Sequence, residues 1–241
     1  MHLSGRTLFI SDLHLDEARP ETTAQFERFL EEAVPGADAL YILGDLFEYW
    51  VGDDGLALPF DARIAGLLSN VAVPKHFMHG NRDFLIAKEF AGKTGSTLLD
   101  DPTVIDLYGE RTVLLHGDTL CTDDIQYQAY RAQVRDPRWQ QAALARPLAE
   151  RVGMAQHLRA QSEAAKGGKA MEIMDVAPAA VEKAFAECGC AVMIHGHTHR
   201  PGRHVHRVNG RDCVRWVLSD WYGKGSYLEA TASGLRSVAV A

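Results

Sequence analysis

Five short polar segments are spaced along this chain, and each carries side chains that bind metal ions. Most of them follow an apolar run of the kind that forms a buried β-strand. In α/β proteins, the carboxyl ends of neighbouring strands lie together and form the site. The repetition therefore predicts that these side chains gather at one end of a sheet. The segments are Asp12-Leu-His14, Gly44-Asp45, Gly80-Asn81-Arg82-Asp83, His116-Gly-Asp118 and Gly196-His197-Thr-His199.

Strand and helix patterns alternate along the first half of the chain. Apolar spacing predicts helices over 21–34 and Asp61–Leu68, and a further helix ends near Glu187. The Asn209-Gly210 pair between two apolar runs indicates a hairpin turn. This alternation favours an α/β layered architecture. The predicted strands are Thr7–Ile10, Leu40–Leu43, Lys75–Met78, Thr112–Leu115, 191–194, Val205–Val208, Cys213–Leu218, Tyr227–Ala230 and Arg236–Val240.

The chain has 241 residues, of which 46% are hydrophobic, and this is enough for a single domain over 1–241 with a substantial core. A net charge of −7 argues against a general nucleic-acid binder. The N-terminal segment lacks the apolar stretch of a signal peptide, and a candidate ligand already occurs at Asp12. No run approaches the roughly 18 apolar residues of a membrane span. We therefore expect a cytoplasmic protein whose four cysteines are buried or incidental thiols.

Residues 121–175 differ from the rest of the chain and predict a helical insertion. They are rich in alanine, glutamine and arginine and contain no strand pattern. From 126 to 169, six arginines and two lysines stand against one aspartate and two glutamates, a net charge of +5. Two interpretations stay open. The insertion presents either an ordinary solvated helical face, or a basic and partly apolar surface that meets an anionic amphiphile or a membrane.

The candidate ligands have a distinct chemistry when they are taken together. Any one of them alone is more often a turn or cap residue. Jointly they offer carboxylate, amide and imidazole donors without a thiolate, which suits Mn²⁺, Fe or Zn²⁺. Seven donors are too many for one ion and fit two ions that share the Asp45 carboxylate. The set is Asp12, His14, Asp45, Asn81, His116, His197 and His199.

In this order, the motifs D-x-H, G-D, G-N-x-D, H-G-D and G-H-x-H resemble the calcineurin-like metallophosphoesterase superfamily. The resemblance implies a four-layer α/β/β/α sandwich, with the helical insertion as a cap, and a dinuclear centre. There a water shared by two cations loses its proton near neutral pH and attacks phosphorus. One metal would be held by Asp12, His14, Asp45 and His199, and the other by Asp45, Asn81, His116 and His197. We expect Asp83 and Asp118 to support the loops through hydrogen bonds, and His195 to be structural.

Arg82 departs from the pattern of many superfamily members, which have histidine there to protonate the leaving oxygen. Arginine cannot act as a general acid near neutral pH. An alkoxide leaving group needs that proton, whereas a leaving phosphate, whose second pKa is about 6, does not. The guanidinium instead offers a planar fork to phosphate oxygens. We infer a pyrophosphate substrate; the alternative is a drifted position in a monoesterase.

Longer segments (G-N-R-D-F, H-G-D-T-L-C-T-D-D and I-H-G-H-T-H-R-P) and the basic insertion resemble one branch of the superfamily more closely. That branch hydrolyses UDP-2,3-diacylglucosamine to 2,3-diacylglucosamine 1-phosphate and UMP in lipid A biosynthesis. Its members typically use Mn²⁺ and bind peripherally to the cytoplasmic face of the inner membrane. The resemblance implies Asp45, Arg82 and His197 as catalytic residues. The implied substrate-binding residues are Asn81, Arg82, Asp124, Ser162, Lys166, Lys169 and His197.

The insertion also provides a hypothesis for the lipid part of such a substrate. Phe84, Leu85, Tyr127 and Tyr130 are candidates to line a groove for acyl chains, although an ordinary core role is equally plausible for Tyr130. Arginines on the insertion would hold it against anionic lipid headgroups. The nearest alternative function is a pyrophosphatase or phosphodiesterase of the same superfamily that acts on a soluble nucleotide or nucleotide-sugar. A non-catalytic scaffold is a further alternative, but such a protein would have lost ligands, and all seven are kept.

Overall fold

The computed structural model describes residues 5–166 and 175–240. Three predicted substrate-binding residues fall at this gap. Lys169 lies outside the described residues, and the side chains of Ser162 and Lys166 lie outside the described side chains.

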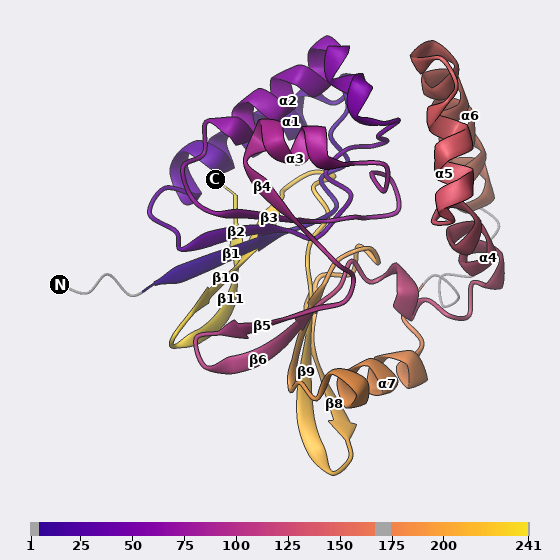
Figure 1. The fold of residues 1–241 in the computed structure, drawn as a ribbon. Helices are drawn as coiled ribbons and strands as arrows, with labels where there is room; N and C mark the ends of the chain where they lie inside the picture. The colour runs from indigo at the N-terminus through magenta and orange to yellow at the C-terminus, as the bar shows by residue number, and fades with distance from the viewer. Residues whose placement is uncertain (1–4, 167–174, 241) are drawn as a thin grey trace.

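Two mixed sheets form the centre of the molecule (Figure 1). Strands β1 to β4 of the first sheet are parallel, as are β6, β7 and β9 of the second. The first sheet has the order β11 (Gly234–Ala239), β10 (Ser226–Thr231), β1 (Arg6–Ile10), β2 (Ala39–Ile42), β3 (Lys75–Met78), β4 (Ser96–Leu99). The second has the order β5 (Thr103–Leu107), β6 (Glu110–Leu114), β7 (Val192–His195), β9 (Arg211–Val217), β8 (Gly202–Val208).

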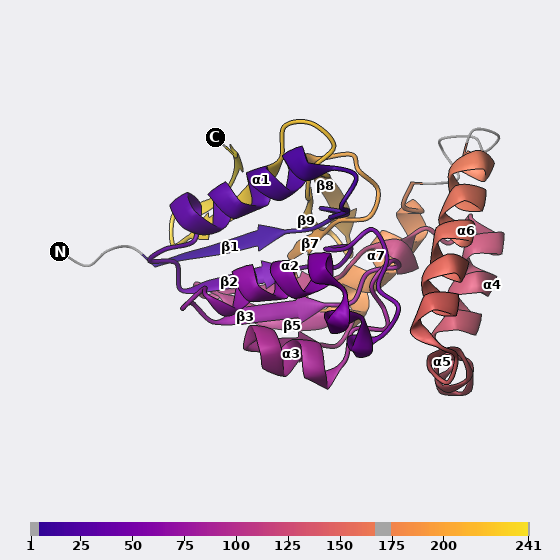
Figure 2. The ribbon, with the colours of Figure 1, turned by 90° about the horizontal axis from the view of Figure 1, so that it is seen from above.

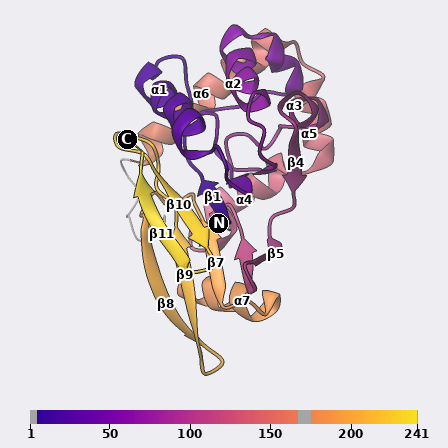
Figure 3. The ribbon, with the colours of Figure 1, turned by 90° about the vertical axis from the view of Figure 1, so that its left-hand side faces the viewer.

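Helices cover the outer face of each sheet (Figure 3). The first sheet is covered by α1 (Pro20–Arg28), α2 (Pro59–Ser69) and α3 (Lys88–Thr94), and the second by α7 (Pro178–Cys188). Proline stands in the first turn of α1, α2 and α7, where its missing N–H costs no helical hydrogen bond. Short π- and 3₁₀-helical turns occur at η1 (Phe29–Ala33), η2 (Asp53–Ala57) and η3 (Asp118–Leu120).

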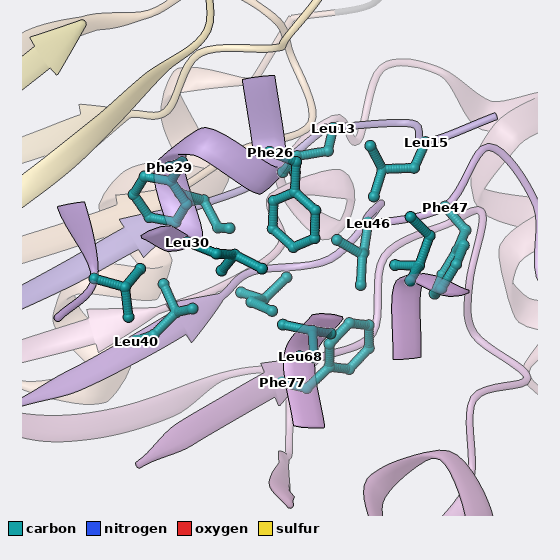
Figure 4. Packing of buried hydrophobic residues seen from close by; sticks show 14 of the residues in the cluster. Leu13, Leu15, Phe26, Phe29, Leu30, Leu40, Leu46, Phe47, Leu68 and Phe77 are labelled. Atoms are coloured by element: carbon teal, nitrogen blue, oxygen red, sulfur yellow. The ribbon is translucent and has the colours of Figure 1, made fainter. Parts of the chain in front are cut away.

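Three apolar layers separate the four layers of secondary structure. Alternate residues of β1 illustrate the division, because successive side chains of a strand point to opposite faces. Leu8 and Ile10 pack against helices, as the labelled Phe26 and Phe29 of that layer show in Figure 4. Phe9 packs between the sheets with residues such as Ile194 of the second sheet. A third cluster lies between the second sheet and α7. The predicted α/β/β/α sandwich is therefore confirmed.

Three further helices stand apart from the sandwich, and we call them the cap. They are α4 (Ile125–Val134), α5 (Pro137–Leu144) and α6 (Leu148–Lys166), and all lie within the predicted helical insertion. Figure 2 shows the strands β1 and β2 pointing toward the cap, so the carboxyl ends of these strands face it. Asp124 and Asp136 begin α4 and α5 by accepting hydrogen bonds from the backbone N–H groups of Tyr127 and Arg138, at 3.1 and 2.8 Å.

All of the predicted strands are present, with ends that differ by up to three residues. The predicted hairpin turn is also confirmed, since Asn209 and Gly210 both have positive φ (50° and 79°). The pattern over 21–34 is α1 followed by a π-helical turn. Elements α3, β4 and β5 were not predicted. Within the described residues, no helix has both the length and the apolar character needed to cross a membrane.

Candidate metal centre

The structure brings all seven predicted ligands to one place at the junction of the two sheets. Three of the five segments follow β1, β2 and β3 of the first sheet. The other two follow β6 and β7 of the second. Since these are all parallel strands within their sheets, their carboxyl ends meet on the side that faces the cap. The arrangement explains why ligands far apart in the sequence converge.

Five of the seven candidate ligands have a left-handed backbone. This conformation is costly for residues other than glycine and persists only where the surroundings impose it. Among the described residues only two other non-glycine positions, Tyr108 and Asn209, share it. The concentration of strained backbone at these positions is typical of a functional site. The five are Asp12 (φ 57°), His14 (49°), Asp45 (54°), His197 (68°) and His199 (54°).

Backbone hydrogen bonds hold the loops in register beyond the ends of the strands. The N–H groups of Asp12 and His14 donate to the carbonyl oxygens of Gly44 and Asp45, at 3.1 and 2.9 Å. In the second sheet, the Gly196 N–H donates to the His116 carbonyl at 2.8 Å. Position 80 requires glycine because its backbone lies close to Asp45, and a Cβ there would overlap the Asp45 carboxylate and backbone.

The first group of donors consists of Asp12, His14 and His199. His199 Nε2 lies 3.1 Å from His14 Nε2 and 3.5 Å from Asp12 Oδ1. Asp12 Oδ1 is buried and accepts no hydrogen bond, whereas Asp12 Oδ2 accepts one from the His197 N–H at 2.8 Å. That hydrogen bond joins the two sheets and turns Oδ1 toward the histidines. Three ligand atoms of this group lie within 4.8 Å of one another.

Asp45 lies between this group and the second one. Its Oδ2 is 3.8 Å from His14 Nε2, and its Oδ1 is 3.8 Å from His116 Nε2. The two oxygens of one carboxylate thus face the two donor groups, which is the position that a bridging ligand requires. Asp12, Asp45 and His116 form a second set, with one ligand atom from each residue and all three atoms within 4.8 Å of one another.

Asn81 and two histidines complete the second group. The Asn81 Oδ1 lies 3.1 Å from His116 Nε2 and 2.9 Å from His197 Nδ1. His116 Nδ1 lies 2.8 Å from the Leu43 carbonyl, to which it must donate, so Nε2 of a neutral ring has a free lone pair. The amide can turn, so that either its oxygen or its N–H₂ group faces these atoms. With the oxygen inward, the amide adds an oxygen ligand to the two imidazoles, and this donor set fits a divalent metal ion.

The protonation of the buried groups also fits cations. Burial raises the pKa of Asp45 well above its usual value. Burial would lower the pKa of His116, but Asp45 and Asp118 raise it to about 9. His116 therefore holds a proton that a cation would replace. Burial lowers the pKa of His197 to about 4 and places that of His14 well below its usual value, so both rings are neutral and able to bind metal.

Asp83, Asp118 and His195 lie behind the ligands, and their contacts agree with the supporting roles we expect. Asp83 accepts hydrogen bonds from the N–H groups of Leu46 and Gly80, both at 2.8 Å. His195 accepts a hydrogen bond from Arg215 at 3.0 Å, and burial and Arg215 lower its pKa to about 3. Asp118 accepts hydrogen bonds from two residues of α4, which are described with the cap below.

Sequence reasoning missed two carboxylates behind the histidines. Glu48 Oε2 lies 3.6 Å from His14 Nδ1, and Asp220 Oδ2 lies 3.5 Å from His199 Nδ1. A carboxylate on the outer nitrogen orients a metal-binding imidazole and increases its basicity. Asp220 follows the strand β9, so it shares the strand-then-carboxylate pattern of the other segments and was detectable. Glu48 carries no such signal, because its neighbours on α6 are more than 100 residues away in sequence.

A cavity of about 830 Å³ adjoins the candidate centre. Arg82 lies where the two meet; its N–H donates to Asp45 Oδ1 at 2.8 Å, and its Nε is 3.9 Å from Asp45 Oδ2. The remaining walls come mainly from the cap. Among the residues predicted from sequence, the lining includes His14, Asp45, Asn81, Arg82, Phe84, Leu85, Asp124, Tyr127, Tyr130, His197 and His199. Lining residues not predicted include Trp50, Trp139, Arg151, Met154, Leu158 and Arg159.

Four of the six insertion arginines point inward and hold the cap against the sandwich. Arg131 Nε donates to Asp118 Oδ2 at 2.8 Å, beside the Tyr127 hydroxyl, which donates to the same oxygen at 2.6 Å. Arg135 donates to the Gly80 carbonyl at 2.8 Å. On α6, Arg151 pairs with Asp54, and Arg159 pairs with Glu48. Much of the positive charge of the insertion therefore serves docking, an alternative that neither sequence interpretation included.

Comparisons with known proteins agree with this geometry. The family model described as calcineurin-like phosphoesterase matches residues 5–201. A protein of Xanthomonas campestris pv. campestris named UDP-2,3-diacylglucosamine hydrolase is 53% identical, over 95% of this chain and 96% of its own length. A protein of the same name from Stenotrophomonas maltophilia is also 53% identical, with 95% and 96% covered.

The bridging position of Asp45 yields a prediction about metal content. In Asp45→Asn, we expect bound Mn²⁺ to fall well below the two ions per chain that the seven donors would hold, because both groups lose a shared anionic ligand. Elemental analysis after dialysis against Mn²⁺ measures this. Asp212→Asn, an exposed carboxylate on β9, is the control and should keep its metal. Equal metal content in the two variants would contradict the bridging role.

Proposed function

The chain belongs to the calcineurin-like phosphoesterase family, and on that premise we propose that it hydrolyses UDP-2,3-diacylglucosamine. The products are 2,3-diacylglucosamine 1-phosphate and UMP, and the bond cleaved is the pyrophosphate. The observation that carries this proposal is the junction of the candidate metal centre with a large cavity whose lining is mostly apolar. The centre suits a phosphate, and the cavity suits acyl chains.

The seven donors would hold two divalent cations, and we propose Mn²⁺ for both. When bound, the cations supply an activated water and positive charge at the phosphate oxygens. One ion would be held by Asp12, His14, Asp45 and His199, and the other by Asp45, Asn81, His116 and His197. The oxygen and nitrogen donors suit Mn²⁺, and the described residues place no thiolate among them.

Arg82 is the residue we assign to the leaving group. Its side chain is largely buried, and contacts with Asp45 hold it at the edge of the centre. From there its donors reach a phosphate oxygen of the departing sugar phosphate. A leaving phosphate needs charge neutralisation rather than a proton, and a guanidinium provides the former and not the latter. This supports a pyrophosphate substrate over a phosphomonoester.

The cavity separates the polar and apolar parts of the proposed substrate. Asn81, Asp124 and His197 line it and would hydrogen-bond the phosphosugar. Phe84 and Leu85 of the loop after β3 also line it, as do Trp139, Met154 and Leu158 of the cap, and these side chains would contact the acyl chains. Ser162, Lys166 and Lys169 remain proposed contacts that lie beyond the described side chains.

We also propose that the cap brings the protein to an anionic membrane surface. Several apolar side chains of the cap are exposed to solvent, including Ile125 (72%), Leu144 (42%) and Leu158 (40%). Arg138 and Arg146 of the cap are exposed as well. Exposed apolar groups and cations on the same cap suit peripheral attachment to anionic lipid.

One experiment tests the proposed reaction. The purified protein is incubated with Mn²⁺ and UDP-2,3-diacylglucosamine in ¹⁸O-water, and the products are identified by mass. We expect UMP carrying the label, because attack at the uridine-linked phosphorus leaves the sugar phosphate unlabelled. The unacylated UDP-sugar is the matched substrate. Equal turnover of the two would contradict the lipid proposal and favour a soluble nucleotide-sugar.

The assignment of Arg82 has its own test. In Arg82→His, we expect kcat for pyrophosphate cleavage to fall by about 100-fold or more, because a charge-stabilising donor is lost. Activity on an alkyl phosphomonoester should rise relative to pyrophosphate cleavage, because histidine can protonate the leaving alkoxide. Arg138→His, at an exposed arginine of α5, is the control. An unchanged rate in Arg82→His would show that the leaving-group argument is wrong.

Membrane attachment is measured by co-sedimentation with vesicles. We expect binding to vesicles containing anionic phospholipid, weakening as salt rises, since screening reduces attraction between exposed charges. A double variant, Arg138→Glu with Arg146→Glu, should bind less. Neutral phosphatidylcholine vesicles serve as the control. Absence of salt-sensitive binding to the anionic vesicles would count against the membrane proposal.

A further inference from the structure

We propose that Glu48 is a positioning residue that couples the docking of α6 to the metal centre. This inference rests on the proposed metal centre but not on the identity of the substrate. Glu48 stands three residues after Asp45, and its side chain is 12% exposed. Its carboxylate meets three partners: Arg19 of the loop after β1, the ligand His14, and Arg159 of the cap helix α6.

The first link runs from Glu48 to His14. Glu48 Oε2 is 3.6 Å from His14 Nδ1, while His14 Nε2 faces Asp45, His199 and Asp12. A carboxylate on that side favours the Nδ1–H tautomer, and this leaves the Nε2 lone pair directed into the centre. His14 Nδ1 has no hydrogen-bond partner at ordinary distance, so a small shift of Glu48 decides whether the contact forms.

Arg19 holds the Glu48 carboxylate from the sandwich side. Its Nη2 donates to Glu48 Oε2 at 2.8 Å and also to the His14 carbonyl. The guanidinium carbon lies 4.7 Å from the centre of the Tyr222 ring, which stacks almost parallel to the His14 ring (5.4 Å between centroids, 5° between planes). His14 is therefore enclosed by Arg19, Tyr222 and Glu48.

The second link runs from Glu48 to the cap. Arg159 Nε donates to Glu48 Oε1, the oxygen that Arg19 does not use. Within the described residues, none of the three apolar clusters includes a residue of α4, α5 or α6. Ion pairs therefore carry much of the docking of α6. Among the side chains that the structure describes, Arg159 pairs with Glu48, and Arg151 pairs with Asp54 and also donates to the Val51 carbonyl.

The two ion pairs dock α6 on different parts of the sandwich. Arg151 docks α6 on η2, away from the ligands, whereas Arg159 docks α6 on the residue that faces His14. Displacing α6 removes one of two cations from a largely buried carboxylate, which then reorients. Because coupling between two binding events is reciprocal, metal that orders His14 and Glu48 must also favour docked α6.

Amide hydrogen exchange of the full chain, without substrate, tests the coupling. We expect Mn²⁺ to slow exchange in α6 of the wild-type protein. In Glu48→Gln, α6 should exchange at one rate with and without Mn²⁺. In Arg151→Met, α6 should exchange faster overall and still be slowed by Mn²⁺. Slowing in Glu48→Gln equal to that in the wild type would overturn the proposal.

Metal affinity is the second measurement. The coupling predicts a change in Mn²⁺ affinity opposite to the change that electrostatic repulsion alone predicts. Removing a cation near a metal centre should strengthen Mn²⁺ binding through lower repulsion. The coupling predicts instead that Arg159→Met weakens Mn²⁺ binding by at least about 5-fold, and that Arg151→Met leaves it unchanged. Binding in Arg159→Met that is equal to or tighter than wild type would overturn the proposal. If Glu48→Gln does not fold, this comparison decides alone.

The outcome of the substrate experiment is independent of the outcomes of the hydrogen-exchange and metal-affinity experiments. A protein that cleaves a different pyrophosphate would still show Mn²⁺-dependent exchange in α6 and the Arg159 effect. A protein that cleaves the diacylated UDP-sugar without these effects would keep the proposed function and lose the role of Glu48.

Discussion

The rest of the structure depends on the burial of two carboxylates, Asp12 and Asp45, among four imidazoles at the junction of two sheets. A buried carboxylate is costly unless positive charge and hydrogen bonds compensate it. Asp12 meets this cost in part through the His197 N–H and His199; burial alone would raise its pKa, yet the neighbouring histidines bring it below its usual value. Asp45 has the opposite shift, and this difference leaves Asp45 as the carboxylate most in need of cations.

Geometry imposes further costs that the surrounding structure must offset. Left-handed backbone at Asp12, His14, Asp45, His197 and His199 would unwind in an isolated loop. Here each loop follows a buried parallel strand and is bonded to the loop beside it. The layers of apolar side chains on either side of each sheet thus stabilise the fold enough to keep these residues in a strained backbone conformation. The site is rigid because the sheets beneath it are.

The cap is attached to the sandwich by arginine contacts rather than by a shared apolar core. It contributes no residue to the three apolar clusters of the described chain and is held by arginines that reach Asp118, Gly80, Asp54 and Glu48. Its apolar side chains are consequently left to line the cavity or to face solvent. A lipid substrate requires apolar side chains in both places, since its acyl chains need an apolar cavity and a route to that cavity from a membrane. Ion pairs, unlike a shared core, also allow α6 to separate from the sandwich without exposing that core.

The sequence by itself determined the ligands and the strands that carry them, because both depend on short-range pattern: an apolar run of four or five residues, then a glycine or polar turn. It also determined the chemistry of Arg82, which follows from its side chain alone. Elements α3, β4 and β5 escaped prediction because each has only four to seven residues, too few for a hydrophobic period to stand out in the sequence. Only the tertiary structure decided that four insertion arginines point inward and that Glu48 joins His14 to Arg159. Those facts depend on which strands are neighbours and on contacts across about 100 residues, and no local pattern records such distances.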